Sequence, residues 1–400
     1  MKARQEEVWY RRPLHDPQKV EIRVKGLWSA EVYDTLTGET EMLSSAFRNG
    51  WTVLHRDLYG NDSLLLRLIP AKEAVESPHA PAAVPDTPAC RFPLPEPFDY
   101  ILSEPNVFLL DRFEYALNDE AFQPMEEMLR LDNQLRARLH WPLRCEALAQ
   151  PYVRVKEERR DHRLRLKAVF SSEISLSGCF LALEEAAFCT GTLNSQPIDW
   201  TPCGYYVDEA LSKVCLPDIR QGKNELIITM AYGDCANLEW MYILGDFGVE
   251  LRGAHTIMTQ KPEKMYWGDY TRQGFPFYTG NMTYCVHLPD SVPRRNEARP
   301  TLQVPYYAGA AVKASLNGEK EQMLALLPNK CMLKGINEKE NVLQITCLGN
   351  RYNGFGQLHM MGDDLSWVGP NSWRTEGTSW TDTYQVKPMG ILSAPLLILD

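Results

Sequence analysis

The sequence predicts an all-β protein made of tandem β-sandwiches, or jelly rolls, with a small β-sandwich in front of them. Three observations support this fold class. Short runs of β-branched and aromatic residues are separated by turns rich in glycine, asparagine and aspartate, which is typical of sandwiches. Strands and helices do not alternate as a parallel α/β sheet requires. Two stretches of the chain also resemble each other, as expected of an internal repeat.

Residues 1–70 are predicted to form the small β-sandwich. Four strand-like runs follow one another there, at residues 19–24, 28–33, 51–58 and 63–69. A piece of about 70 residues can bury only a thin core. We therefore expect it to pack on another domain, inside or outside this chain.

Residues 71–97 are predicted to be a proline-rich linker. Residues 70–97 contain eight prolines, counting Pro70 and Pro97 themselves, with alanines among them. Proline fixes φ and removes a backbone donor, so such a stretch is unsuited to a central strand or a helix interior. A semi-extended connection is the expected structure.

Residues 98–258 are predicted to form the first jelly-roll sandwich, with one helix near residues 124–139. Pro124 suits the first turn of a helix, and apolar side chains recur on one face as far as Leu139. We expect this helix to lie against a sheet edge. The sequence leaves open which sandwich residues 98–145 join.

The internal repeat predicts that residues 259–400 form a second jelly-roll sandwich. Leu193-Asn194 matches Leu316-Asn317, and an N-x-L-x-I-T pattern begins at Asn224 and again at Asn341. Asparagine tolerates the positive φ that tight hairpin turns require. Each half therefore reads as a strand, an asparagine turn, a long loop and a second strand.

Charge and composition exclude several function classes. The net charge is −10, and runs of basic residues never exceed two. A nucleic-acid binder or a protein of anionic membrane surfaces would be expected to carry a basic face. No stretch of about 18 apolar residues is present either, so no membrane-spanning helix is expected.

The ten cysteines and the N-terminus indicate a reducing compartment. No two cysteines form a C-x-x-C pair, which removes the usual zinc and redox signatures. The first residues contain no apolar segment of the kind that starts a signal peptide. We expect a cytoplasmic protein whose thiols are mostly buried small hydrophobes.

The strand, Leu-Asn turn and Asn-x-Leu-x-Ile pattern resembles the galactose-binding-like jelly rolls of the β-galactosidase and β-glucuronidase superfamily. In that superfamily a glycine usually stands two residues before the asparagine. Gly222 matches this position, whereas the second repeat has Lys339 there. Four further stretches resemble the C-terminal ancillary region of family-2-like and rhamnosidase-like bacterial glycosidases: residues 106–115, 244–249, 267–280 and 350–359. The resemblance covers most of the chain.

The resemblance implies a non-catalytic role. The family's catalytic residues lie on a (β/α)₈ barrel, whose alternating strands and helices are missing here, so no catalytic residue is assigned. Glu184-Glu185 and Asp363-Asp364 are adjacent pairs, which do not suit two carboxylates flanking one bond. We expect carbohydrate binding or domain packing. The alternatives are a free-standing rhamnosidase- or galactosidase-like glycosidase with an unrecognised site, and an interaction module without sugar affinity.

Carbohydrate sites combine an aromatic platform with amide and charged partners. Two aromatic clusters supply the candidate sugar-binding residues, and a third, around Trp200 and Tyr205, favours a structural role. The candidates are Trp367, Asn371, Trp373, Arg374, Trp380, His359, Trp267 and Asp269. For the cluster around Trp373, ligand contact and the packing of another domain both remain open.

No cofactor is expected, although a structural Ca²⁺ bound by Asp and Asn loops is compatible with a jelly roll. The histidines are scattered, and none forms an H-x-x-x-H pair. The expected partners are a carbohydrate and a catalytic barrel, either as a domain of a longer chain or as a separate chain. Nucleic acid and membrane are not expected partners.

Overall fold

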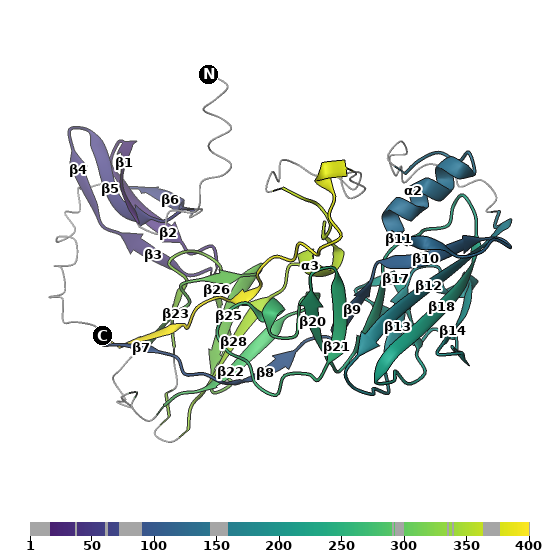
Figure 1. The fold of residues 1–400 in the computed structure, drawn as a ribbon. Helices are drawn as coiled ribbons and strands as arrows, with labels where there is room; N and C mark the ends of the chain where they lie inside the picture. The colour runs from purple at the N-terminus through teal and green to yellow at the C-terminus, as the bar shows by residue number, and fades with distance from the viewer. Residues whose placement is uncertain are drawn as a thin grey trace.

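A computed structural model describes most of the chain. The described residues are 17–36, 38–60, 63–71, 90–144, 159–289, 292, 300–333, 336–337, 340–362 and 377–399. They form sheets of mostly antiparallel strands that pack into sandwiches, with few helices (Figure 1). The predicted all-β fold class is confirmed. None of the helices in the described ranges is long and apolar enough to cross a membrane.

The N-terminal strands form two three-stranded sheets, drawn in purple in Figure 1. One sheet has the order β1 (Gln18–Lys25), β5 (Trp51–Leu58), β4 (Ser45–Arg48). The other has the order β3 (Thr40–Leu43), β2 (Trp28–Tyr33), β6 (Leu65–Pro70). Their buried apolar side chains are Ala30, Val32, Val53 and Leu54, so the core of this piece is thin.

The predicted proline-rich linker falls largely outside the described residues. Where the description resumes, Cys90–Pro93 forms strand β7, which pairs with β30 (Leu396–Leu399) near the other end of the chain. The last part of the predicted linker therefore includes an edge strand. Prolines are tolerated in edge strands because one side of the strand has no ladder partner.

The central sandwich packs an eight-stranded sheet on a five-stranded sheet. The larger sheet contains β10 (Arg112–Leu117), β11 (Gln123–Glu127), β12 (His162–Ser172), β14 (Cys189–Leu193), β15 (Gln196–Pro197), β18 (Gly222–Tyr232), β20 (Gly248–Arg252) and β21 (His255–Thr259). The smaller sheet has the order β16 (Tyr205–Tyr206), β17 (Asp208–Cys215), β13 (Phe180–Leu183), β19 (Met241–Gly245), β9 (Asn106–Leu110). Alternation along β12 buries Leu164, Leu166 and Ala168 between the sheets.

In the described part of the chain the long helix is α2 (Met128–Arg138), which begins four residues later than predicted. Residues Gln123–Glu127 instead pair with β10 as strand β11. The Glu127 side chain caps the helix, because its carboxylate accepts the backbone N–H groups of Leu129 and Arg130 at 3.0 and 2.9 Å. The helix buries Met128, Leu129, Leu131 and Leu135 in the core of the central sandwich.

The last sandwich is completed by strands from both sides of the central one. Its first sheet has the order β26 (Gln322–Leu324), β25 (Ala311–Leu316), β28 (Val342–Leu348), β22 (Met282–His287), β8 (Asp99–Leu102). Its second sheet has the order β27 (Lys330–Met332), β23 (Thr301–Gln303), β30, β7. A short pair, β24 (Tyr307–Ala308) and β29 (Gly390–Ile391), lies beside them. Residues 98–145 thus divide: β8 joins the last sandwich, and β9 onward joins the central one.

The asparagine repeat is confirmed by identical hydrogen bonds in the two sandwiches. In the central one, Asn194 Nδ2 donates to Asn224 Oδ1 at 2.7 Å, and the Asn194 Oδ1 accepts the next strand's backbone N–H at 3.0 Å. In the last one, Asn317 Nδ2 donates to Asn341 Oδ1 at 2.9 Å, with the equivalent acceptance at 2.9 Å. Asn194 and Asn317 both have φ of 52°. In each sandwich the pair of asparagines therefore fixes a turn to the start of the following strand by the same hydrogen bonds.

The C-terminal segment returns over the central sandwich before it reaches β30. Phe355, in the short helix α3 (Tyr352–Phe355), packs on Tyr206 and Tyr242 of the central core. Met389 and Ile391 then enter the core of the last sandwich. Figure 1 shows this segment in yellow, running between the two sandwiches. It brings side chains far along the sequence against β9 and β10.

Candidate functional site

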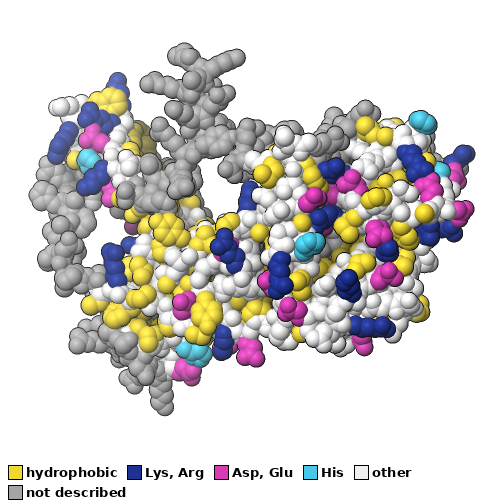
Figure 2. Space-filling view, in the orientation of Figure 1, with side chains coloured by type: hydrophobic (Ala, Val, Ile, Leu, Met, Phe, Trp, Pro, Cys, Tyr) yellow, Lys and Arg dark blue, Asp and Glu magenta, His cyan; other side chains and the backbone are white. Residues whose placement is uncertain are grey.

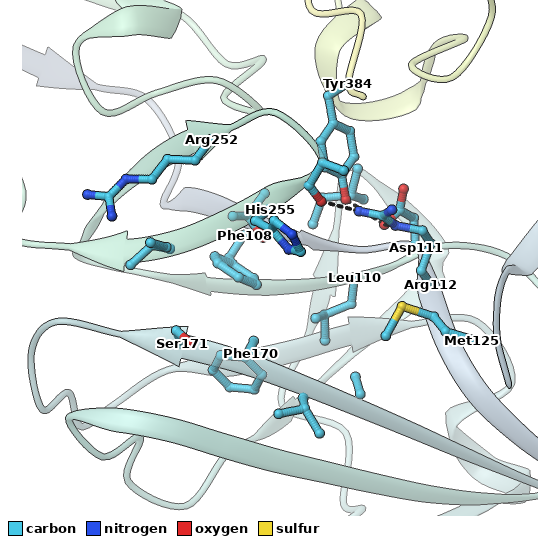
Figure 3. Close-up of a pocket in the computed structure, with 16 residues that line it drawn as sticks. Phe108, Leu110, Asp111, Arg112, Met125, Phe170, Ser171, Arg252, His255 and Tyr384 are labelled. Carbon is cyan, nitrogen blue, oxygen red and sulfur yellow. Dashed lines mark hydrogen bonds and ion pairs between the residues drawn. The ribbon is translucent and has the colours of Figure 1, made fainter. Parts of the chain in front are cut away.

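A cleft of about 390 Å³ opens at one end of the central sandwich. Its walls are the end of β9 and the start of β10, the C-terminal part of β12, and the hairpin formed by β20 and β21. Phe108 and Phe170 lie at its apolar base, with their ring centroids 5.4 Å apart. In Figure 3, Tyr384 reaches down toward Asp111 and Arg112, while His255 lies across the cleft and Arg252 points away from the others.

Asp111 is the buried anchor of this cleft. One carboxylate oxygen accepts the Tyr384 hydroxyl at 2.7 Å, and the other lies 2.5 Å from His359 Nε2. The Asp111 backbone carbonyl accepts the N–H of Met128, the first residue of α2, at 2.8 Å. Asp111 therefore joins β9, helix α2 and the C-terminal segment at one point.

His359 is held between two acceptors. Its Nδ1 lies 2.8 Å from the backbone carbonyl of Thr381, while Nε2 faces Asp111. Both side chains are buried, so these two contacts link the central sandwich to the C-terminal segment away from water.

Trp380 covers this link. Its ring stacks on His359, with centroids 4.8 Å apart and an interplanar angle of 28°. The Arg130 guanidinium of helix α2 lies 4.5 Å from the Trp380 ring centroid, within cation–π range. Trp380 thus ties residues 377–384 to α2.

Arg112 supplies a cation to the cleft. Its guanidinium lies 3.9 Å from Asp111 and 3.8 Å from the exposed Asp382, and it donates to the Ala254 backbone carbonyl. It also stands 5.4 Å from the Tyr384 ring centroid. The guanidinium is thereby fixed at the mouth of the cleft, next to His255.

Glu127 is a buried carboxyl near Asp111. Burial raises its pKa to about 7, against the opposing effect of the Trp240 indole N–H, which donates to it at 2.6 Å. The nearby Asp111 carboxylate raises the pKa further. Because its oxygens also accept the first N–H groups of α2 and it does not line the cleft, Glu127 stabilises the helix terminus.

The structure places two of the predicted sugar-binding residues together and two elsewhere. His359 and Trp380 stack on each other where His359 contacts Asp111, and neither lines the cleft. Trp267 packs in the last sandwich, 4.3 Å from Phe98 between ring centroids, and donates to the Leu94 carbonyl at 3.1 Å. Asp269 there caps the short 3₁₀ helix Tyr270–Arg272. The remaining four candidates lie outside the described residues: Trp367, Asn371, Trp373 and Arg374.

The two adjacent carboxylate pairs weighed from the sequence, Glu184-Glu185 and Asp363-Asp364, do not lie in this cleft as far as the structure describes them. Glu185 pairs with Arg160 at 2.6 Å and accepts the Asn237 backbone N–H at 3.2 Å. Glu184 accepts the Asn237 side-chain amide. Both therefore fix one loop of the central sandwich, and Asp363-Asp364 lies outside the described residues.

Sequence reasoning did not single out Asp111, Arg112, His255 or Tyr384. One signal was present: Asp111 and Arg112 directly follow the apolar run of residues 107–110. A charged pair at the end of a buried strand indicates a side-chain partner or a site. Across the described ranges, no group of three His, Cys, Asp or Glu side chains lies close enough to hold a metal ion.

Comparisons with known proteins give no family match: no family model and no curated protein matches the chain. Among solved structures, it is similar to a rhamnosidase from Novosphingobium sp. PP1Y, with 13% identity and a TM-score of 0.25 over 64% of this chain and 24% of that one. A β-D-mannosidase from Dictyoglomus thermophilum shows 11% identity and a TM-score of 0.22 over 61% and 31%. The α-L-rhamnosidase of Streptomyces avermitilis shows 8% identity and a TM-score of 0.23 over 95% and 36%. The chain thus spans about a quarter to a third of the length of the first two.

Proposed function

We propose that this chain is a non-catalytic, carbohydrate-binding part of a glycoside hydrolase-like protein, and that it binds sugar in the cleft beside Asp111. The observation that supports this is the cleft itself. Its volume of about 390 Å³ lies in the range of small-molecule sites. Phe108 and Phe170 offer an apolar base, while Arg112 and His255 offer donors at the mouth. An apolar surface with a few fixed polar groups matches a sugar ring, which has apolar faces and a rim of hydroxyls.

Asp111 argues for binding over catalysis. Glycosidases need two carboxyl groups on either side of the scissile bond, about 5 to 9 Å apart. Both Asp111 oxygens are occupied by Tyr384 and His359, so this carboxylate is held as a structural acceptor. For the free-standing glycosidase alternative, the candidate second carboxylate is Asp382, which lies 3.8 Å from Arg112 on the C-terminal segment.

Binding is tested by adding simple sugars to the protein and measuring the heat of binding by calorimetry and the melting temperature by thermal shift. A ligand at 100 times its Kd stabilises the native state by about 2.7 kcal/mol, so binding raises the melting temperature. His255→Ala is expected to remove the shift, because His255 is exposed and lines the cleft. His287→Ala, an exposed histidine on the last sandwich, is the matched control. A shift that survives His255→Ala would refute this placement.

The test of catalysis is a screen of aryl glycosides, with α-rhamnoside and β-galactoside first. We expect no turnover above the buffer rate. Robust turnover that is abolished by Asp382→Asn would contradict the non-catalytic role and support the glycosidase alternative.

Domain packing is the second proposed role, and the N-terminal sandwich favours it. Its exposed large apolar side chains are Leu36, Met42, Phe47, Trp51, Leu65, Leu68 and Ile69, and Leu65 is 55% exposed. Figure 2 shows hydrophobic side chains among the charged ones on this piece. Exposed apolar groups beside so thin a core suit contact with another domain, and a catalytic barrel is the partner we propose.

An immunoblot of source-cell extract with an antibody against this chain tests that partner. A band far above 45.8 kDa would support a barrel on the same polypeptide. A band near that mass, together with no barrel protein in a pull-down, would contradict this role.

A further inference from the structure

Two cysteine thiols meet on the outer surface of the five-stranded sheet. Cys203 precedes β16, and Cys215 ends β17. Their Sγ atoms lie 3.7 Å apart, and both residues are exposed. This site is separate from the cleft, because β17 and β9 are divided by two other strands of the sheet.

The backbone fixes the two thiols opposite each other. The Cys203 N–H donates to the Lys213 carbonyl at 2.8 Å, and the Lys213 N–H donates to the Gly204 carbonyl at 2.9 Å. Strand β17 also pairs with β13 on its other edge, where Cys215 lies opposite Phe180. An S–S bond is about 2.05 Å long, so each sulfur has to move by only about 0.8 Å.

Lys213 and the neighbouring thiol act on Cys203 in opposite directions. Burial and the interaction with the neighbouring Cys215 thiol raise the pKa of the Cys203 thiol, and the Lys213 ammonium opposes the rise. The attacking form in thiol–disulfide exchange is the thiolate. Exchange at this pair therefore accelerates as the pH rises through the alkaline range.

We propose that Cys203 and Cys215 form a reversible dithiol–disulfide site that exchanges with low-molecular-weight disulfides such as glutathione disulfide. One protein thiolate attacks a glutathione sulfur, forming a mixed disulfide and releasing one glutathione thiolate. The second protein thiolate attacks the protein sulfur of that mixed disulfide, forming the Sγ–Sγ bond and releasing the second glutathione. The two thiol protons end on the two released glutathiones, and two electrons pass from the pair to glutathione disulfide.

The other described cysteines lack this combination of exposure and a partner thiol. Burial raises the pKa of Cys179 to about 11 and of Cys189 and Cys347 to about 12. Cys90 is exposed on the edge strand β7, without a second thiol recorded beside it in the described part of the chain. Cys90 therefore serves as the exposed single-thiol reference.

Mass spectrometry after redox equilibration tests the proposal. The native chain is incubated with mixtures of glutathione and glutathione disulfide, quenched in acid, alkylated and digested. Trypsin cuts after Lys213, so a disulfide between Cys203 and Cys215 links two separate peptides. We expect this linked pair to form, to disappear with dithiothreitol, and to form faster at pH 8.5 than at pH 7.

Three variants distinguish the possible outcomes. Cys215→Ser is expected to stop at the mixed disulfide on Cys203, and Cys203→Ser to abolish the linked peptides. Cys90→Ser is expected to leave the cross-link unchanged. The proposal is overturned if the native chain accumulates glutathione on Cys203 or Cys215 without the cross-link. It is also overturned if both cysteines stay reduced, and are therefore alkylated after the quench, under conditions in which glutathione disulfide modifies Cys90.

Discussion

Replacing Tyr384 by Phe tests the idea that Asp111 holds the C-terminal segment on the central sandwich. The change removes the hydroxyl that donates to Asp111 at 2.7 Å and keeps the ring. Hydrogen bonds to charged groups contribute about 1.5–3 kcal/mol. Asp111 is buried, 2% exposed, so water cannot replace the lost donor without opening the segment.

Hydrogen exchange measures this loss locally. Thr381 and Gln385 donate their backbone N–H groups to the His359 and Leu358 carbonyls at 3.0 and 2.7 Å, so their amides report opening of the segment. A loss of 1.5–3 kcal/mol corresponds to exchange about 10 to 150 times faster. Amides of β25 and β28, in the last sandwich, are expected to keep their protection.

A matched control and a cycle make the result specific. Tyr205→Phe removes a hydroxyl from an exposed tyrosine and is expected to leave exchange unchanged. If Tyr384→Phe accelerates exchange at Thr381 and Gln385 less than threefold, the hydrogen bond to Asp111 is not what holds the segment. A double-mutant cycle with Asp111→Asn should show a coupling energy, because the two side chains contact each other.

Three further predictions concern the helix cap and the central and last sandwiches. Because the pKa of Glu127 is raised to about 7, the folded state binds a proton that the unfolded state releases, so the free energy of unfolding falls by about 3 kcal/mol as the pH rises from 4.5 to 7. Glu127→Gln should flatten this pH dependence, measured by urea unfolding, and an unchanged pH dependence would contradict the raised pKa. Asn224→Ala and Asn341→Ala should each lower the free energy of unfolding by about 1–3 kcal/mol, and hydrogen exchange should accelerate only in the sandwich that carries the substitution. Faster exchange in both sandwiches would show that the two sandwiches are not independent. Gly191→Ala places a Cβ against the Ile227 carbonyl of the paired strand and should cost about 1–3 kcal/mol by thermal unfolding, whereas an unaltered melting temperature would mean that the strands separate freely.

The fold was predictable from the sequence where the physics is local. The asparagine turns at Asn194 and Asn317 were identified because a positive φ favours particular residues. The repeat pattern then followed, since the same turn chemistry recurred before the same strand. The start of helix α2 was misplaced because Pro124 fits both a first helical turn and an edge strand, and only pairing with β10 decides between them.

The site was less predictable because its contacts are distant in the sequence. Asp111 meets His359 and Tyr384, which are 248 and 273 residues away. Composition and spacing identified His359 and Trp380 as members of an aromatic cluster, but gave no reason to place them on Asp111. The sequence grouped Trp267 and Asp269 as sugar-binding candidates, but it gave no sign that Trp267 packs on Phe98 or that Asp269 caps a short helix.

The interleaving of the last sandwich has a consequence for how the chain folds during synthesis. Strands β7 and β8 leave the ribosome before the whole central sandwich, but their partners, β30 and β22, come after it. Because domains generally fold as units in order of synthesis, the central sandwich can close while β7 and β8 still wait with unpaired edges. Those two strands are therefore the part of the nascent chain most exposed to chaperones and to mispairing with a neighbouring copy.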